Sequence, residues 1–375
     1  MKLVVAGLVV MTSMSTAYSG TDSTIVEYLR AHSQTPTGYV LSKATSHRIT
    51  LIGEGHWLKH DVALVAGLIP ALQQAGIDLA LEVFPASEQA NIDELVTMPD
   101  WNDQVANAIV RAAAWPYQEY RNLLRAAWSA NQGADRHIRI LGLGPPQDWR
   151  DVLLPKGITY DEFMADLVTK HSRQTRRRVV VYCGMHHAFT RYYQAELDNS
   201  GVAMAYMDRM GNILLRQFGE QVFVIALHKP MWCGSPAKPS YCLPFGGQID
   251  CAAASLGGPL GFDIVGSPLA ELHFGPDDYY GYGHSALRFV DYTDGYIWSG
   301  PVTSFQSVSI IPLSEYAPGE EAMAQVAHEN PFNGEEDVSV QRLQEIWAEE
   351  IEASRDILAQ RRWKHLADWE VRCKP

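Results

Sequence analysis

The stretch "RITLIGEGHW", residues 48–57, decides the fold class because an apolar run of strand-forming residues gives way abruptly to glycines and polar groups. Apolar runs without alternation are typical of strands that are covered on both faces, as in a parallel sheet. Further runs of this kind recur along the chain, and they are "DLALEVF" (78–84), "IRILGLG" (138–144), "RVVVYCG" (178–184), "QVFVIAL" (221–227) and "FDIVG" (262–266). The sequence therefore predicts a buried, mostly parallel sheet.

Segments with helical periodicity separate these runs. They span roughly residues 60–75, 86–97, 102–113, 117–132, 160–174 and 204–218. Alternation of strand and helix indicates right-handed crossover connections. We expect an α/β fold with a mostly parallel central sheet flanked by helices.

Two segments interrupt this pattern and suggest a division of the chain. Residues 229–260 are rich in Cys, Pro and Gly, and we expect a long surface loop inserted there, with a possible role as a lid. Residues 335–372 have apolar positions spaced for one face of a helix. The expected organisation is a signal peptide (1–19), an α/β domain (20–330) and a C-terminal helical extension (331–375).

The amino-terminal residues have the character of a targeting segment. Lys2 precedes an apolar stretch, and Ala17 and Ser19 provide small residues before a cut near Gly20. This pattern predicts export, to a periplasm or the outside of the cell; a short apolar strand is the alternative. The apolar stretch is too short to span a bilayer, so we expect no membrane span.

The cysteines agree with an oxidising compartment. Three of the five, Cys233, Cys242 and Cys251, crowd into one Pro- and Gly-rich segment. One disulfide among these three is expected, with the pairing open, and the odd total leaves at least one thiol unpaired.

The charge balance narrows the classes of partner. The formal net charge is −13, so the chain has no electrostatic reason to bind nucleic acid or an anionic membrane. A small-molecule or peptide substrate is the expected partner.

Polar side chains stand where several predicted strands end. Glu54 and His56 follow the first strand, Glu82 interrupts the second, His187 follows the fourth, and His228 follows the fifth. Ligands of open α/β sheets bind beyond the carboxyl ends of the strands. We therefore expect a site there, and we interpret the nearby His60 as an ordinary helix residue.

The chemistry of these groups allows two kinds of site. A buried carboxylate such as Glu82 must pair with a cation, bind a metal or have a raised pKa. A histidine that pairs with a glutamate can act as a general base toward water. The set His56, Glu82 and His187 also suits a divalent metal such as Mn, Zn or Co. The residue types alone do not choose between these sites.

Taken in order, these motifs resemble the erythromycin esterase-like family and its wider superfamily, which includes ChaN-type haem-binding proteins and the TIKI proteases. "LIGEGHW" (51–57) is similar to a strand-end motif of that family, one residue tighter than in the esterases. "LALEVF" (79–84) is similar to its strand with an embedded Glu, and "VVVYCGMHHAF" (179–189) to its second histidine motif. The segment 229–260 has no counterpart in this resemblance.

The resemblance implies a hydrolase of an ester, lactone or amide, working either with or without a metal. His56 would be the base or a metal ligand, and Glu82 would orient it or ligate the metal. His187 would polarise the carbonyl or complete a metal triad, and Glu54 would support the site or replace Glu82 in its role. One alternative is a haem- or iron-binding protein of the ChaN type, with Tyr182, Tyr192 or Tyr193 as axial ligands. The other alternative is an effector-type protein without catalysis.

Overall fold

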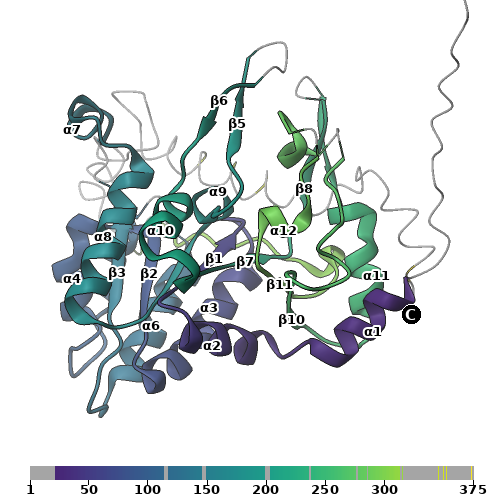
Figure 1. Ribbon diagram of the computed structural model, residues 1–375. Helices are drawn as coiled ribbons and strands as arrows, with labels where there is room; N and C mark the ends of the chain where they lie inside the picture. Colours follow the sequence, from purple (N-terminus) through teal and green to yellow (C-terminus); the bar gives the residue numbers. More distant parts are fainter. Residues whose placement is uncertain are drawn as a thin grey trace, which may run out of the picture.

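The sheet is the centre of the molecule. In the computed structural model, seven strands form one sheet between two layers of helices (Figure 1). The structure describes residues 22–312 except 114–116, 146–148, 199–202, 236–237, 276–277 and 285, together with Glu315, Glu345, Glu349, Glu352 and Cys373. The expected signal peptide (1–19) and nearly all of the expected C-terminal helix lie outside the described residues.

The strand order places β1, the first strand in the sequence, at the middle of the sheet. The order is β10-β11-β7-β1-β4-β2-β3. Every neighbouring pair is parallel except β10 with β11. The bounds are β1 Ile49–Glu54, β2 Asp78–Pro85, β3 Ile140–Gly144, β4 Val179–Gly184, β7 Val222–Leu227, β10 Leu260–Asp263 and β11 Gly295–Trp298. The predicted α/β fold with a mostly parallel central sheet is confirmed.

The apolar strands bury both of their faces, as their composition predicts. In β1, Leu51 packs with one cluster of core residues and Ile52 with the other. One face is covered by α2 (Pro36–Ser46), α3 (Lys59–Ala75), α4 (Gln89–Leu95), α5 (Asp103–Ala112) and α6 (Gln118–Asn131). The opposite face is covered by α1 (Ser23–His32), α8 (Tyr160–Thr175), α10 (Met210–Phe218), α11 (Gln248–Ala254) and α12 (Phe289–Tyr292).

The prediction of one helix at residues 204–218 is wrong for the first part of this segment. Residues Ala203–Met207 form β6, which pairs with β5 (Gln194–Leu197) in a hairpin, and only α10 is helical. Met204 and Tyr206 are exposed on this hairpin, so their apolar character does not report a buried helical face. Strand β11 was not predicted, because "GYIW" is short and lies in a stretch rich in Tyr, Gly and Asp.

The prediction of a long surface loop at residues 229–260 is also wrong in part. It folds into a hairpin of β8 (Met231–Ser235) and β9 (Lys238–Cys242), followed by α11. Ile249, Ala252 and Ala253 are buried on α11 because their helical spacing gives it one apolar face. Two further short helices are α7 (Trp149–Val152) and α9 (Met185–Ala188).

Two disulfides hold this region. Cys233 pairs with Cys242 across the β8–β9 hairpin, with 6.1 Å between their Cα atoms, which agrees with the expected bridge among the three clustered cysteines. Cys251 on α11 pairs with Cys373. Cys183 is a buried free thiol. No helix within the described part of the chain is long and apolar enough to cross a membrane.

Candidate functional site at the carboxyl edge of the sheet

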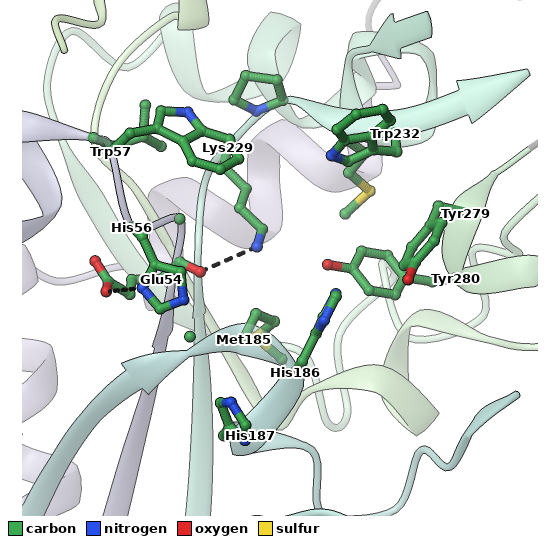
Figure 2. A pocket seen from close by; sticks show the side chains of 15 residues that line it. Glu54, His56, Trp57, Met185, His186, His187, Lys229, Trp232, Tyr279 and Tyr280 are labelled. Carbon is green, nitrogen blue, oxygen red and sulfur yellow. Dashed lines mark hydrogen bonds and ion pairs between the residues drawn. The ribbon is translucent and has the colours of Figure 1, made fainter. Parts of the chain in front are cut away.

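Four adjacent strands bring the site together. β7, β1, β4 and β2 are neighbours in that order, and the parallel strands end at the same edge. A cavity of about 420 Å³ lies beyond this edge (Figure 2). Its walls are formed by Glu54, Gly55, His56, Trp57, Leu58, Gly184, Met185, His186, His187, Lys229, Pro230, Met231, Trp232, Tyr279 and Tyr280. The cavity therefore lies at the edge of the sheet where ligands of open α/β folds bind.

Glu54 and His56 form a hydrogen-bonded pair at the end of β1. The Glu54 Oε1 atom lies 2.8 Å from Nδ1 of His56, and the Tyr182 hydroxyl donates to the other carboxylate oxygen. Burial alone lowers the pKa of His56, but the hydrogen bond and charge of Glu54 and the charge of Glu82 outweigh burial, and the pKa is raised above its usual value. Since Nδ1 must donate to the carboxylate, Glu54 fixes the tautomer and the orientation of the ring.

Glu82 and His187 form a second pair beneath the first. Glu82 accepts a hydrogen bond from the Gly184 amide at 2.7 Å, and its other oxygen lies 3.2 Å from Nε2 of His187. Burial favours the neutral form of Glu82, but the charge of His187 prevails and lowers the pKa of Glu82 to about 2. Burial likewise opposes the charged form of His187, but Glu82 and Asp161 raise the pKa of His187 to about 10. At neutral pH the pair is a carboxylate and an imidazolium.

Asp161 completes this second pair from the other side. Its Oδ1 atom lies 2.7 Å from Nδ1 of His187 and accepts the Met210 amide at 2.8 Å. Arg209 donates to Oδ2 at 3.3 Å. Asp161 lies in the first turn of α8, so this contact ties α8 and α10 to the site. Both ring nitrogens of His187 thus face carboxylates.

The four predicted site residues take different places. Glu54, His56 and His187 line the cavity, whereas Glu82 lies behind the wall and contacts His187. In the described part of the chain, no group of three or more His, Cys, Asp or Glu side chains is arranged to hold a metal ion. The proposed ligand set His56, Glu82 and His187 is therefore a connected cluster of charges, in which His187 is engaged by two carboxylates.

Other candidates from the sequence lie outside the cavity. His228 is fully buried, with Nδ1 2.8 Å from the Tyr296 hydroxyl and Nε2 2.9 Å from Asp250. His60 lies on α3 as expected and packs on Phe305, with 3.8 Å between the ring centroids.

None of the tyrosines suggested as haem ligands lines the cavity. Tyr182 packs in the core on the face of the sheet that α2 to α6 cover, because alternate residues of β4 face opposite sides. Tyr192 is buried and donates to the Tyr280 carbonyl, and Tyr193 lines a separate hollow.

Several wall residues were missed by the sequence reasoning. His186 stacks on Tyr279, with 5.8 Å between the centroids and 16° between the planes. Burial, followed by the charges of Lys229 and Arg209, lowers the pKa of His186 to about 3, so its ring is neutral at physiological pH. Adjacency to His187 was the signal for His186. Lys229 lies two residues after the end of β7, so it has the same signal, a position near a strand end, that Glu54 and His187 have.

These observations define an α/β protein with a candidate site at the carboxyl edge of its sheet. Residues 40–160 match the sequence model of a family described as haem-binding uptake, Tiki superfamily, ChaN. This part of the chain is therefore similar to the superfamily that includes the ChaN and Tiki proteins. The matched segment contains Glu54, His56 and Glu82 but ends before β4 and His187.

The first two of the following three solved structures share the fold. A Bacillus cereus protein matches with a TM-score of 0.50 and 11% identity, covering 77% of this chain and 99% of that one. A succinoglycan biosynthesis protein matches with a TM-score of 0.54 and 9% identity, covering 77% and 98%. An erythromycin esterase in its open conformation matches with a TM-score of 0.48 and 11% identity, covering 75% and 98%. No curated protein matches the chain.

Proposed function

We propose that the protein is a hydrolase in which His56 activates water for attack on an ester, lactone or amide. The observation that carries this proposal is the Glu54–His56 pair at the cavity wall, with 2.8 Å between carboxylate and imidazole. A buried carboxylate on one ring nitrogen directs the other nitrogen to accept a proton, which is the arrangement of a general base.

The steps follow from this geometry. His56 takes a proton from water as the oxygen adds to the carbonyl carbon, and Glu54 stabilises the imidazolium that forms. The tetrahedral intermediate collapses, the bond to the leaving group breaks, and the imidazolium returns its proton to the departing alkoxide or amine. The Tyr182 hydroxyl holds Glu54 in place throughout. His187 is held at the cavity wall by Glu82 and Asp161, whose negative charges offset its own.

The test is hydrolysis of a panel of esters, lactones and peptides by the wild type and by His56→Ala. We expect the variant to lose at least about a hundredfold in rate. The matched control is His32→Ala, because His32 is exposed on α1, away from the cavity. Equal rates for His56→Ala and wild type on a substrate that the wild type hydrolyses would refute the role of His56.

Haem binding is a second candidate, favoured by the description of the matched family. The cavity fits this group in its chemistry, since His186, Met185, Met231 and Tyr279 are types of residue that ligate haem iron. His186 is neutral, which is the form that binds a metal. When bound, haem would supply redox or iron-carrier chemistry. A hemin titration tests this: a Soret shift that His186→Ala removes and His56→Ala leaves would favour haem binding over hydrolysis.

We further propose that the protein works in an oxidising compartment. The two disulfides would be reduced in a typical cytosol, and they support the export that the amino-terminal sequence predicts. Fractionation of cells that produce the full chain, with a thiol count on the recovered protein, tests this proposal.

A further inference from the structure

Lys229 brings a positive charge into the cavity. Its ammonium donates to the main-chain carbonyl of Glu54 at 3.1 Å. Within the described residues, no carboxylate lies within ion-pair distance of this ammonium. Figure 2 shows the side chain reaching from the wall toward the middle of the cavity, above the His56 ring. A partly buried ammonium with one neutral acceptor keeps donors available for a ligand.

The fold places Lys229 there firmly. His228, the residue before it, is locked into the core by Tyr296 and Asp250, so the next side chain is directed to the opposite side of the chain, into the cavity. The stem of Lys229 lies against Gly55, where a β-carbon would be 3.4 Å from its Cδ. The Lys229 side chain is therefore positioned by His228, which precedes it, and by Gly55, against which it packs.

The carboxylates around the cavity are engaged by groups other than Lys229. Three carboxylates, those of Glu54, Glu82 and Asp161, are held by hydrogen bonds or ion pairs with His56, His187, Arg209 and Tyr182. Nothing in that network neutralises Lys229. An anion that enters the cavity meets this charge in a partly dehydrated setting, where charge pairing is stronger than in water.

The opposite wall is aromatic. Trp232, Tyr279 and Tyr280 face Lys229 across the cavity, and Trp57 covers it from above (Figure 2). Such a wall takes the apolar or ring part of a ligand. The single positive charge of Lys229 matches the single negative charge of a monoanion such as a carboxylate.

We propose that the cavity selects ligands that carry a carboxylate beside an apolar or aromatic body, and that Lys229 is the residue that reads the carboxylate. This inference names the substrate class of the proposed hydrolase. Ligand binding can be measured without hydrolysis, so this inference can fail or succeed separately from the proposed hydrolytic function.

The test compares naphthalene-2-acetate with naphthalene-2-acetamide, a neutral molecule of nearly the same shape, by isothermal titration calorimetry on the full chain. We expect the wild type to bind the carboxylate about tenfold more tightly than the amide. Lys229→Gln should bind both molecules with the affinity that the wild type has for the amide, and Lys229→Arg should retain the preference. The control is Lys170→Gln, which removes an exposed lysine of α8.

Each other outcome overturns the proposal. The proposal is refuted if the wild type binds both molecules equally well or shows no saturable binding of either. It is also refuted if Lys229→Gln keeps the preference for the carboxylate. If a hydrolysed substrate is found, Lys229→Gln should raise KM for anionic substrates and leave kcat and neutral substrates unchanged. An equal fall in kcat for both kinds of substrate would assign Lys229 to the reaction itself and refute its role in selection.

Discussion

At the scale of single residues, Glu54 controls the base that we propose. Its hydrogen bond and charge raise the pKa of His56 against the effect of burial. A general base works when it is deprotonated, so the rate should rise with pH through this raised pKa.

Glu54→Gln removes the charge and keeps the shape. The pKa of His56 should fall, and the acidic limb of the pH–rate profile should move to lower pH by about one unit while kcat falls about tenfold or more. The measurement is kcat/KM between pH 4 and 9. Tyr182→Phe is the control, because it leaves the Glu54–His56 hydrogen bond in place and should shift the limb less. An unmoved limb in Glu54→Gln would contradict the assignment.

His187 stabilises the fold through two buried carboxylates. His187→Gln leaves Glu82 and Asp161 without their shared cation, and the free energy of unfolding should fall by about 3 kcal/mol at pH 7. Urea unfolding measures this. His32→Gln, on an exposed histidine, should change little.

The pH dependence of stability has a definite sign. The pKa of His187 is raised from 6.5 to about 10, so its contribution is complete below pH 6.5 and is lost as pH rises toward 10. The pKa of Glu82 is lowered from 4.5 to about 2, so its contribution is present above pH 4.5 and is lost as pH falls toward 2. The deficit of His187→Gln should therefore shrink at both extremes. A constant deficit from pH 3 to 10 would count against this pair.

The sequence could place Glu54, His56 and His187 near one another, because strand ends meet at one edge of a parallel sheet. It could not place Asp161, which reaches His187 through the packing of α8 on the sheet. Nor could it show that Glu82 contacts the Gly184 amide, since this depends on the pairing of β2 with β4.

At the scale of elements, the turn from β4 into α9 must lie close to His56. A β-carbon on Gly184 would be 2.6 Å from Nε2 of His56, although φ of −53° at Gly184 permits any residue. The constraint on this glycine is thus space for the imidazole.

Gly184→Ala should displace His56 and lower activity at least about tenfold while the fold is retained. Gly67→Ala is the matched control: nothing lies within 4 Å of the added carbon, and in the interior of α3 the change should stabilise by up to about 1 kcal/mol. Activity assays and thermal melts of both variants decide the matter. Full activity in Gly184→Ala would show that His56 need not stay where it lies.

The elements most fully predicted are those with long, uniform patterns. β1, β2, β4 and β7 match the expected runs within a residue or two because both of their faces are buried. Short elements such as β11, and hairpins such as β5–β6, carry too few residues for a clear period. Their existence is decided by partners distant in the sequence.

At the scale of the whole molecule, a disulfide ties α11 to the far end of the chain. Cys251 and Cys373 are 122 residues apart in sequence, with 4.8 Å between their Cα atoms. Closing so long a loop restricts the unfolded chain considerably.

Cys373→Ser should lower the free energy of unfolding by about 3 kcal/mol without changing affinity at the cavity. Thermal melts in the presence and absence of a reductant measure the first effect. Reduced wild type should lose at least as much stability as the variant, because it loses the β8–β9 bridge as well. A variant as stable as the oxidised wild type would contradict the expected effect.

One hydrogen bond, from Lys229 to the carbonyl of Glu54, joins residues 175 positions apart. The proposed base lies within the segment that matches the superfamily, and the proposed reader of the carboxylate lies beyond it. Evolution could therefore change the ligand specificity without changing the reaction. A substitution of the one side chain after β7 would admit new ligands, while the proposed catalytic residues after β1 stay the same.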